Sequence, residues 1–401
     1  MARQRRHLMI VDNHFPDPRV EREAHALMAR GFAVDVICAG EPGEPRRDQL
    51  DGIRVYRLPV RRRRGMGIAA QLVEYVTFAA WATAMTALLD GRRRYDSVQA
   101  HNVPDFLVFA AGVPKLRGAP VILDLHDLMP EFFAARFGGR VESLPVRLVR
   151  WQEWASAGFA DHVLTVTDLW RDELVRRGLP AGKVEVVMNL PDPEVFARRD
   201  PVVRPDAEPI VLVYHGTLTH RYGIDTLLRA VALLRSRIPV RLVLHGRGEF
   251  VPQAEALIAE LQISDQVEMS VGVLPTAALP ELIGQADIGV IPYRRDVFTD
   301  GILPTKLLEY TALGIPSVVA RSRAVETYFS SEMVRFVEPD DPVGLAAAIE
   351  ELAADPEVRR SLATRAQEFT DRYSWPDQAQ RYADLVERLI ARKRRPNAPP
   401  S

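Results

Sequence analysis

The residues best suited to chemistry are a lysine and a glutamate three positions apart, at the start of a predicted helix. Lys306 and Glu309 follow Pro304 in LPTKLLEYTALGIP, where proline suits a first helical turn and Gly314 can end the helix. Residues at this spacing share one helix face, close to the unpaired N–H groups of the helix N-terminus. Such a position favours an anion. We expect the amides near Pro304–Lys306 and the Lys306 ammonium to bind phosphate, and Glu309 to accept from ribose hydroxyls.

An exposed ion pair on an amphipathic helix would show the same spacing, and this alternative stays open. The basic composition favours the functional interpretation. The chain has four lysines, and arginine takes nearly every other basic position. A lysine at this loop–helix junction therefore stands out.

Two other predicted strand-to-helix loops of the second half suit an anion or the close approach of a ligand. The loop HGTLTHRYG has Gly216, which permits close approach, and Arg221, which can reach phosphate oxygens. The loop HGRGEF places Gly246 and Gly248 after another strand. A glycine after a strand is ordinary turn chemistry, but three such loops on one edge of a parallel sheet indicate a ligand site.

Two polar clusters follow predicted strands of the first half. His101 and Asn102 follow one strand, and His126 and Asp127 follow another, with Glu131 shortly after. Ligands of parallel sheets bind beyond the carboxyl ends of the strands. A histidine at a strand end is often bonded to nearby backbone, so a structural and a functional role both stay open.

Strand-length apolar runs alternate with helix-length segments along the whole chain. This alternation predicts an α/β protein with parallel sheets and helices on both faces. The loop after the first strand lacks a G-x-G-x-x-G pattern, which argues against a dinucleotide site there. The predicted strands are 7–11, 34–38, 53–58, 97–100, 121–125, 162–166, 184–187, 210–214, 240–244, 266–269, 287–292 and a last one before Arg321.

At 401 residues the chain exceeds what one hydrophobic core usually supports. The segment from Asn189 to Pro209 carries five prolines and many charges, which is typical of a linker. The predicted divisions are a first Rossmann-like domain over 1–190, a linker over 191–209, a second over 210–374, a helix over 375–392 and a disordered tail over 393–401.

Composition excludes several classes of protein. Apolar residues make up 47% of the chain and the formal net charge is −1, which argues against disorder and against a globally basic nucleic-acid binder. The single cysteine, Cys38, lies in an apolar run and has no partner for an intramolecular disulfide. The first apolar run is too short for a signal peptide, so we expect a cytoplasmic protein.

Arg61–Arg64 precede Met66–Leu89, a segment about long enough to span a bilayer. Gln71, Glu74 and several small residues dilute it, which favours a helix packed in the first domain. The basic run could still rest on an anionic membrane surface, at about 1 kcal/mol per charge. A peripheral contact with the inner face of a membrane is therefore an expectation.

Several segments together give roughly residues 7–390 a resemblance to the retaining glycosyltransferases of family GT4, group 1. They are LPTKLLEYTALGIPSVVA, ADIGVIPY, HGTLTHRYGIDTLLRA, ADHVLTVTDLWRDEL with VEVVMNLPD, and DLHDLMPE. The resemblance implies the GT-B fold, two facing Rossmann-like domains with a C-terminal helix that crosses back to the first. It implies a nucleotide-sugar donor, with uridine or guanosine as the base, in the second domain and a sugar, lipid-linked or small-molecule acceptor in the first.

The chemistry that the resemblance implies keeps the configuration of the transferred sugar and uses no cofactor, no metal and no covalent protein nucleophile. Positive groups and helix ends would stabilise the leaving diphosphate. Glu309 would contact ribose, while His126, Arg221 and Lys306 would be catalytic. The predicted donor-binding set is Gly216, Thr217, Arg221, Gly246, Gly248, Asp300, Gly301, Pro304, Thr305, Lys306 and Glu309. The predicted acceptor-side residues are Arg19, His101, Asp127 and Glu131.

Two departures from the family pattern leave alternatives open. Gly301 stands where the Glu-x7-Glu motif has its first glutamate, with Asp300 beside it, and Thr217 stands where an arginine is common. The leading interpretation is a glycosyltransferase that assembles a cell-surface polysaccharide or glycolipid. A non-catalytic nucleotide-sugar-binding subunit and a nucleotide-sugar epimerase of the same fold are the alternatives.

Overall fold

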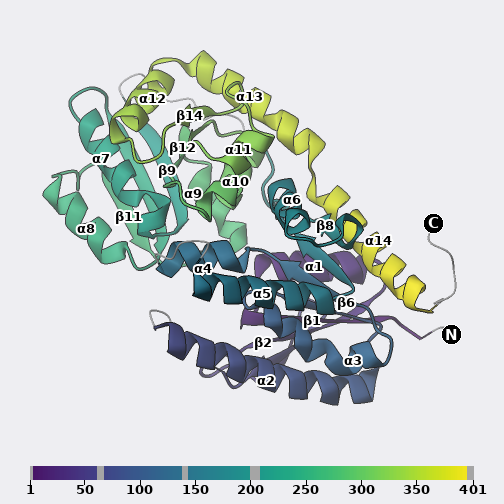
Figure 1. Ribbon diagram of the computed structural model, residues 1–401. Coiled ribbons are helices and arrows are strands. Elements are labelled where there is room, and N and C mark those ends of the chain that lie inside the picture. Colours follow the sequence, from purple (N-terminus) through teal and green to yellow (C-terminus); the bar gives the residue numbers. More distant parts are fainter. Residues whose placement is uncertain (1–2, 61–66, 138–142, 199–207, 395–401) are drawn as a thin grey trace. The chain divides into compact units, whose positions relative to one another are not determined.

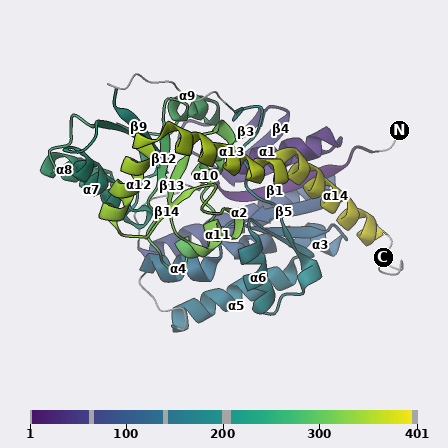
Figure 2. The same cartoon turned by 90° about the horizontal axis from the view of Figure 1, so that it is seen from above.

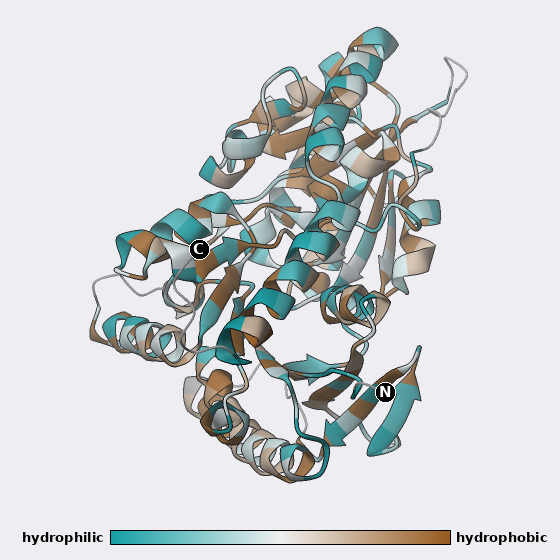
Figure 3. Cartoon of the chain, turned by 90° about the vertical axis from the view of Figure 1, so that its right-hand side faces the viewer, coloured by the Kyte–Doolittle hydropathy of each residue, from teal (hydrophilic) through white to brown (hydrophobic). Residues whose placement is uncertain are grey.

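The computed structural model describes residues 3–60, 67–137, 143–198 and 208–394 (Figure 1). The chain forms two compact units, one of Met1–Met188 with Pro376–Ser401 and one of Asn189–Trp375. In each unit the strands are largely hydrophobic, whereas the helices show hydrophobic residues beside hydrophilic ones (Figure 3). This is the pattern of amphipathic helices packed on buried sheets.

The first unit contains an eight-stranded sheet in the order β3-β4-β2-β1-β5-β6-β7-β8. Its pairs are parallel except β3 with β4. The chain starts at β1 and builds outward in both directions, so β1 and β5 form the switch point. The strands are β1 Arg6–His14, β2 Ala33–Ala39, β3 Arg47–Leu50, β4 Ile53–Leu58, β5 Ser97–His101, β6 Val121–Leu125, β7 His162–Thr165 and β8 Val184–Val186.

Strand β3 was not predicted from the sequence. It forms a hairpin with β4 through Asp51 and Gly52, both with positive φ. An Asp-Gly pair between two short runs is a strong hairpin signal. The polar composition of β3, RDQL, had hidden it.

Helices cover the sheet of the first unit. Asp17 caps α1 by accepting from the N–H groups of Arg19 and Val20. Helix α2 packs its inner side in the core of this unit, as predicted for Met66–Leu89, while Arg61–Arg64 lie outside the described residues. The helices are α1 Pro18–Ala29, α2 Ile68–Arg93, η1 Asp105–Ala111, α3 Gly112–Leu116, α4 Met129–Phe137, α5 Leu144–Phe159, α6 Asp168–Arg176 and η2 Ala181–Lys183.

The last helix, α14 (Trp375–Arg394), packs on the first unit although it follows the second in sequence. Figure 2 shows α14 next to β1 and β5, and a hydrogen bond joins Tyr382 of α14 to Gln99 of β5. Tyr382 is fully buried and its hydroxyl donates to Gln99 Oε1 at 2.6 Å. The predicted tail boundary at residue 393 is wrong, because Lys393 and Arg394 continue the helix and pair with Asp161 and Asp96.

The second unit contains a six-stranded parallel sheet in the order β11-β10-β9-β12-β13-β14. Strand β9 starts it, β10 and β11 extend it on one side, and β12 to β14 extend it on the other. The strands are β9 Ile210–Thr217, β10 Val240–Arg247, β11 Val267–Val271, β12 Ile288–Ile291, β13 Ser317–Ala320 and β14 Arg335–Val337. The switch point between β9 and β12 is where such sheets bind ligands, beyond the carboxyl ends of the strands.

Helices connect these strands as the alternation predicted. Helix α10 starts at Thr305, with Pro304 as its cap residue rather than its first helical residue, and ends at Gly314 in the left-handed conformation. The helical segments are η3 His220–Tyr222, α7 Ile224–Leu234, α8 Val251–Glu260, η4 Thr276–Ala278, α9 Leu279–Ile283, η5 Thr299–Gly301, α10 Thr305–Leu313, α11 Arg323–Tyr328, α12 Pro342–Ala354 and α13 Pro356–Arg372.

The hydrogen bond between Tyr382 and Gln99 should contribute measurably to the stability of the first unit, because it joins α14 to β5. Changing Tyr382 to Phe removes a buried donor and leaves Gln99 Oε1 unpaired, which should lower the free energy of unfolding by about 1–3 kcal/mol. Urea denaturation measures this. The control is Arg388→Ala, which breaks an exposed pair with Glu185 and should change stability by less than about 1 kcal/mol. Equal effects of the two substitutions would contradict the buried contact.

Candidate functional site

The carboxyl edge of the second sheet holds a buried ammonium group. Lys306 is 6% exposed, and its Nζ donates to the hydroxyl of Tyr293 at 2.5 Å. The same nitrogen lies 4.8 Å from the ring centres of Tyr214 and Tyr293 and 5.2 Å from that of Tyr222. Tyr222 and Tyr293 are stacked on each other at 4.1 Å. Aromatic faces attract a cation, so three tyrosines form a cage for the charge.

The cage is assembled at the switch point of the sheet. Tyr214 lies in β9, Tyr293 follows β12, and Tyr222 ends the short helix η3 after β9. Lys306 comes from the first turn of α10. Its position agrees with the prediction that this lysine lies at a strand-end edge near a helix N-terminus.

Gly216 leaves space next to the ammonium group. Its φ is +106°, and a Cβ built on it would lie 3.7 Å from Lys306 Nζ. Any side chain at Gly216 would therefore stand against the lysine, in a backbone conformation that favours glycine. Gly216 and Thr217 are both exposed, so this side of the cage is open to solvent.

Burial lowers the pKa of Lys306 to about 8, with the charge of Glu309 opposing the shift. The group is still largely protonated at neutral pH, but its charge is held in an unfavourable environment. An anion placed beside it would relieve this penalty. Binding of a negatively charged group would therefore be favoured, because it would remove part of the free-energy penalty of burying the ammonium.

Glu309 is oriented by a histidine. Its Oε2 lies 2.7 Å from His215 Nε2, and His215 Nδ1 lies 3.1 Å from the hydroxyl of Tyr310. Lys306 is buried and no ion pair found in the described part of the chain joins it to Glu309. The alternative of an exposed Lys306–Glu309 pair is therefore wrong. The half-buried carboxylate keeps acceptor capacity beside the cage.

Arg221 lies next to Tyr222 and thus beside the cage. Its Nε is 3.4 Å from Asp296 Oδ2, and its guanidinium lies 5.3 Å from the ring centre of Phe298. Planar packing on a ring and one carboxylate neighbour hold the side chain in place. The structure thus brings Gly216, Lys306 and Glu309 together, with Arg221 on the adjoining element.

Gly246 and Gly248 have a packing role. A Cβ at Gly246 would lie 1.7 Å from Gly216 O, and one at Gly248 would lie 1.9 Å from Leu218 O. Backbone oxygens at such distances cannot give way. These glycines allow the loops after β9 and β10 to pack closely, which fixes the position of Gly216.

Asp300 is engaged within the protein. Its carboxylate accepts from Arg295 Nε at 3.0 Å, from Arg323 Nε at 2.6 Å and from the Arg323 N–H at 3.0 Å. Gly301 is buried beside it, in η5, and Thr305 is exposed at the start of α10. Asp300 lies in the segment that connects β12 with α10, and its bonds to Arg323 attach this segment to the start of α11.

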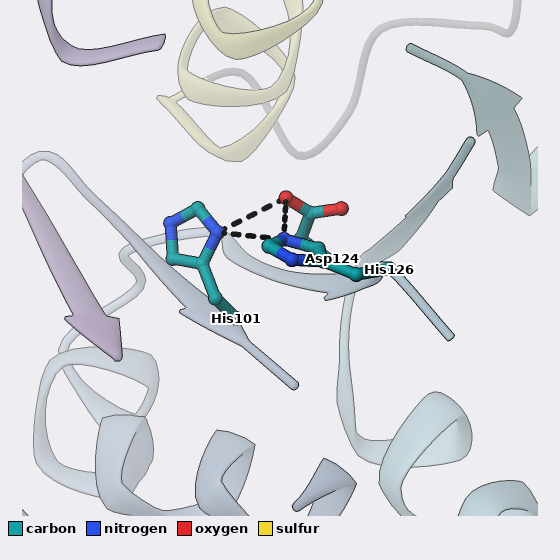
Figure 4. A group of neighbouring side chains, drawn as sticks. All are labelled: His101, Asp124 and His126. Carbon is teal, nitrogen blue, oxygen red and sulfur yellow. Dashed lines mark hydrogen bonds and ion pairs between the residues drawn. The ribbon is translucent and has the colours of Figure 1, made fainter. Parts of the chain in front are cut away.

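In the first unit, two histidines and an aspartate meet at the carboxyl ends of β5 and β6 (Figure 4). Asp124 Oδ2 lies 3.0 Å from both His101 Nδ1 and His126 Nε2, and the two nitrogens are 3.2 Å apart. The other carboxylate oxygen accepts from Arg19 Nη2 at 3.2 Å. Asp124 thus holds both imidazoles in fixed orientations. His101 is fully buried, whereas the His126 side chain is 23% exposed.

The charges in this cluster are uneven. Burial opposes ionisation of Asp124, but Arg19 and His126 hold the pKa of this carboxyl well below its usual range. Burial lowers the pKa of His126, and Arg19 lowers it further. Burial also disfavours the charged form of His101, but Asp124 and Glu23 outweigh it and raise the pKa of His101. His126 is thus the more readily neutral histidine and is partly accessible to a ligand.

The ligand atoms of His101, Asp124 and His126 lie within 4.8 Å of one another, so the three residues could hold a metal ion. Imidazole and carboxylate ligands suit zinc and related metals. The same atoms already satisfy one another by hydrogen bonds, and Arg19 adds a positive charge to the carboxylate. The cluster is therefore stable without a metal ion, and a cation would compete with Arg19 for Asp124.

Further buried polar groups support the cluster. Gln99 Nε2 donates to Glu23 Oε2 at 2.7 Å and to Asp124 Oδ2 at 3.3 Å. Burial and the charge of Asp124 raise the pKa of Glu23 to about 7. Arg19, predicted on the acceptor side, is 7% exposed and bonded to Glu23 and Asp124, so it positions the cluster from within.

Asn102 fixes the loop that carries His126. Its Oδ1 accepts from the His126 N–H at 2.8 Å, and its Nδ2 donates to Asp127 O at 2.6 Å. Glu131 belongs to another network, because it pairs with Arg177, which also pairs with Glu153 at 2.7 Å. The structure therefore joins His101, His126 and Asp127 but places Glu131 in a separate ion-pair cluster.

Sequence reasoning missed eight side chains of these two sites. Asp124 and Gln99 had a visible signal, since each is a polar residue inside a short buried strand, VILDL and SVQAH. The tyrosines gave a weaker one, as aromatic residues at the ends of strands. The missed residues are Glu23, Gln99, Asp124, Tyr382, Tyr214, His215, Tyr222 and Tyr293.

Known proteins resemble this chain in sequence over both units. A glycosyl transferase 4-like domain matches residues 16–189, and a glycosyl transferases group 1 domain matches residues 197–369. An uncharacterized glycosyltransferase of Methanocaldococcus jannaschii is 25% identical over 91% of this chain and 92% of its own. The alpha-D-kanosaminyltransferase of Streptomyces kanamyceticus is 26% identical over 85% of this chain and 90% of its own.

Solved structures show the same fold. Sucrose-phosphate synthase from Thermosynechococcus elongatus superposes with a TM-score of 0.76 at 21% identity, covering 96% of this chain and all of that one. An Anabaena protein crystallised with UDP-glucose gives a TM-score of 0.70 at 16% identity, covering 95% and 99%. The chain therefore belongs to the group 1 glycosyltransferases and has the GT-B fold. It is a glycosyltransferase enzyme, which sets aside a non-catalytic subunit and an epimerase.

The lowered pKa of Lys306 predicts a stability effect with a defined sign. The folded protein releases this proton near pH 8 and the unfolded chain near 10.5, so the buried charge destabilises the ligand-free fold below pH 8 and stability rises above it. Changing Lys306 to Met should therefore stabilise the ligand-free protein at pH 7, by about 3 kcal/mol at most. The gain should shrink towards pH 10, as thermal unfolding at several pH values can show.

The matched control is Lys115→Met, which removes a half-buried lysine paired with Asp161 in the first unit. This substitution should not raise the stability of the protein at any pH. A Lys306→Met protein that is less stable than the parent at pH 7 would contradict the account of a penalised charge.

Proposed function

We propose that the enzyme transfers a sugar from a nucleotide-diphosphate sugar, bound by the second unit, to an acceptor bound by the first. The observation that carries this proposal is the buried ammonium of Lys306 at the switch point of the sheet, open beside Gly216. A buried cation with no carboxylate on it, in a site that a ligand can reach, favours an anionic ligand.

The neighbouring groups fit a nucleoside diphosphate better than a simple anion. Arg221 adds a second positive group for phosphate oxygens, and the α10 N-terminus adds backbone N–H groups. Glu309, held by His215 at 2.7 Å, offers a carboxylate for vicinal ribose hydroxyls. We infer a UDP- or GDP-sugar as donor, since relatives include proteins named for GDP-mannose or crystallised with UDP-glucose.

The reaction we propose breaks the bond between the anomeric carbon and the diphosphate while an acceptor hydroxyl attacks the same face. Charge develops on the leaving diphosphate, where Lys306 and Arg221 would stabilise it. His126, held by Asp124 and mostly neutral, would contact the transferred sugar. No metal and no organic cofactor forms part of this proposal.

The acceptor we propose is a growing polysaccharide, a glycolipid or a small molecule, handled in the cytoplasm. The relatives support this range without selecting from it. Their names include a kanosaminyltransferase and an enzyme assigned to colanic acid biosynthesis in Escherichia coli. A screen of nucleotide sugars, with donor hydrolysis as the first readout, would narrow both substrates.

Substitutions at the donor site should separate binding from catalysis. Changing Glu309 to Ala removes a charge-assisted hydrogen bond of about 1.5–3 kcal/mol and should weaken nucleotide affinity roughly 10- to 150-fold. Changing Lys306 or Arg221 to Ala should lower kcat as well as affinity, because these groups face the charge that develops in the transition state. Calorimetry and steady-state kinetics measure the two effects. Folded variants that bind nucleotide diphosphates like the parent would show that the site is misplaced.

The stereochemical outcome is a separate prediction. An α-linked donor should give an α-linked product, since attack and departure occur on the same face. Proton NMR of the first product formed reports the anomeric configuration. A β product from an α donor would exclude this mechanism.

A further inference from the structure

Helix α2 exposes an apolar surface along nearly its whole length. By length and composition its segment Ala69–Arg93 could cross a membrane, yet only 28% of its most apolar stretch is buried. Phe78 and Ala82 on its inner side are fully buried in the core of the first unit, so the helix packs on that unit through this side. Its outward residues Leu72, Val73, Val76, Trp81 and Leu88 are 46–66% exposed.

Helix α5 carries a second exposed apolar stripe. Leu144, Leu148 and Trp151 follow each other at helical spacing and are 60–67% exposed, and Trp154 is 58% exposed. Val146 and Ala157, on the inner side, are fully buried. Two tryptophans on one outward helix face are unusual for a surface that meets only water.

The two stripes belong to one face of the first unit. Helices α2 and α5 both pack on η1, and Phe109 of η1 contacts Phe159 of α5 with ring centres 5.0 Å apart. Phe109 is itself 42% exposed, and Leu116 of α3 is 91% exposed. Figure 1 shows α2, α3 and α5 in the lower half of the view. We call the outward sides of α2, η1, α3 and α5 the α2–α5 face.

The exposed charges of the α2–α5 face have one sign. Arg92 and Arg147 are exposed on its helices. The carboxylates of the same elements are withdrawn from solvent: Glu74 is half-buried, and Asp90, Asp105 and Glu153 are buried. The face therefore presents apolar side chains and arginines, with no exposed carboxylate among the described residues of these four elements.

A recess opens beside the tryptophans of α5. It has a volume of about 300 Å³, and Arg147, Arg150, Trp151 and Trp154 line one part of it. Leu179 and the ion pair of Glu153 with Arg177 line the rest. The Nε atom of Arg150 is buried without a hydrogen-bond partner. Two guanidinium groups beside indole rings suit a phosphate group whose attached chain is apolar.

We propose that the α2–α5 face docks on the surface of an anionic phospholipid membrane. Leucines and valines would enter the boundary of the acyl chains, the indoles would lie at headgroup level, and the arginines would meet lipid phosphates. A second copy of this chain fits the face less well. A two-fold contact would bring arginines against arginines with no exposed carboxylate to pair with them.

The test is flotation of the full-length protein with vesicles of phosphatidylcholine alone or mixed with phosphatidylglycerol. Binding should require the anionic lipid and weaken as salt is added. Lipids brominated near the headgroup end of their acyl chains should quench tryptophan fluorescence, because Trp81, Trp151 and Trp154 would lie where the headgroups meet those chains. Changing Arg92 and Arg147 together to Glu should weaken binding by about thirtyfold or more.

The apolar contribution is tested by Val73→Glu with Leu148→Glu, both at exposed positions. This pair should abolish bromine quenching and leave donor binding intact. The matched control is Val343→Glu, which charges a valine that is 60% exposed in the second unit and should bind vesicles like the parent. Absence of binding to anionic vesicles at low salt, or binding that both double variants retain, would overturn the proposal. So would a lipid-free dimer that Val73→Glu dissociates, since the face would then be an interface between copies.

Discussion

A charge buried without an opposite charge raises the free energy of a folded protein, and the second unit is built around such a charge. The ammonium of Lys306 lies among three tyrosine rings and donates to one tyrosine hydroxyl, while the nearby carboxylate of Glu309 is hydrogen-bonded to His215. Tyrosine faces reduce the penalty of burial but do not remove it, and the pKa of Lys306 stays near 8. The remaining penalty is what an anionic ligand can relieve. Gly246 and Gly248 allow the chain after β9 and β10 to pack closely, which fixes the position of Gly216 beside the lysine.

The first unit treats buried charge differently. Asp124 is surrounded by Arg19 and two histidines, and Gln99 links it to Glu23 and to Tyr382 of the last helix. Every major charge there has a partner, so the cluster is a rigid support that presents His126 at the end of β6. The first unit thus holds His126 in place, and the second unit keeps the charge of Lys306 without an opposite charge on it. This division fits the proposed transfer from a nucleotide-diphosphate sugar to a sugar or lipid hydroxyl.

The sequence was sufficient to predict the strand–helix alternation, the switch to a new sheet after the proline-rich segment, and the lysine at the start of α10. These features depend on local periodicity and turn chemistry, which a sequence shows directly. The polar strand β3 was missed for the same reason, because its residues do not alternate in hydrophobicity.

The burial of Lys306 could not be predicted, since Tyr214, Tyr222 and Tyr293 come from a strand, a short helix and a loop that meet only in the folded unit. The ion-pair partners of Asp300 and Glu131 could not be predicted either. Asp300 binds Arg323 and Glu131 binds Arg177, residues 23 and 46 positions further along the chain. Gly246 and Gly248 were predicted in a loop after a strand, but β10 includes Gly246. The packing role of the two glycines depends on the backbone oxygens of Gly216 and Leu218. Long-range contacts of this kind leave no pattern in a single sequence.

The most direct test of the central claim is the proton balance of nucleotide diphosphate binding, measured by calorimetry at pH 8 in two buffers of different ionisation enthalpy. A diphosphate placed beside Lys306 must raise the pKa of that group from about 8. The account predicts uptake of up to about half a proton per nucleotide bound by the parent, since a group is half protonated at its pKa, and none attributable to this residue in the Lys306→Met variant. Tight binding by the parent with the same proton balance as the variant would contradict the claim that the buried lysine meets the diphosphate.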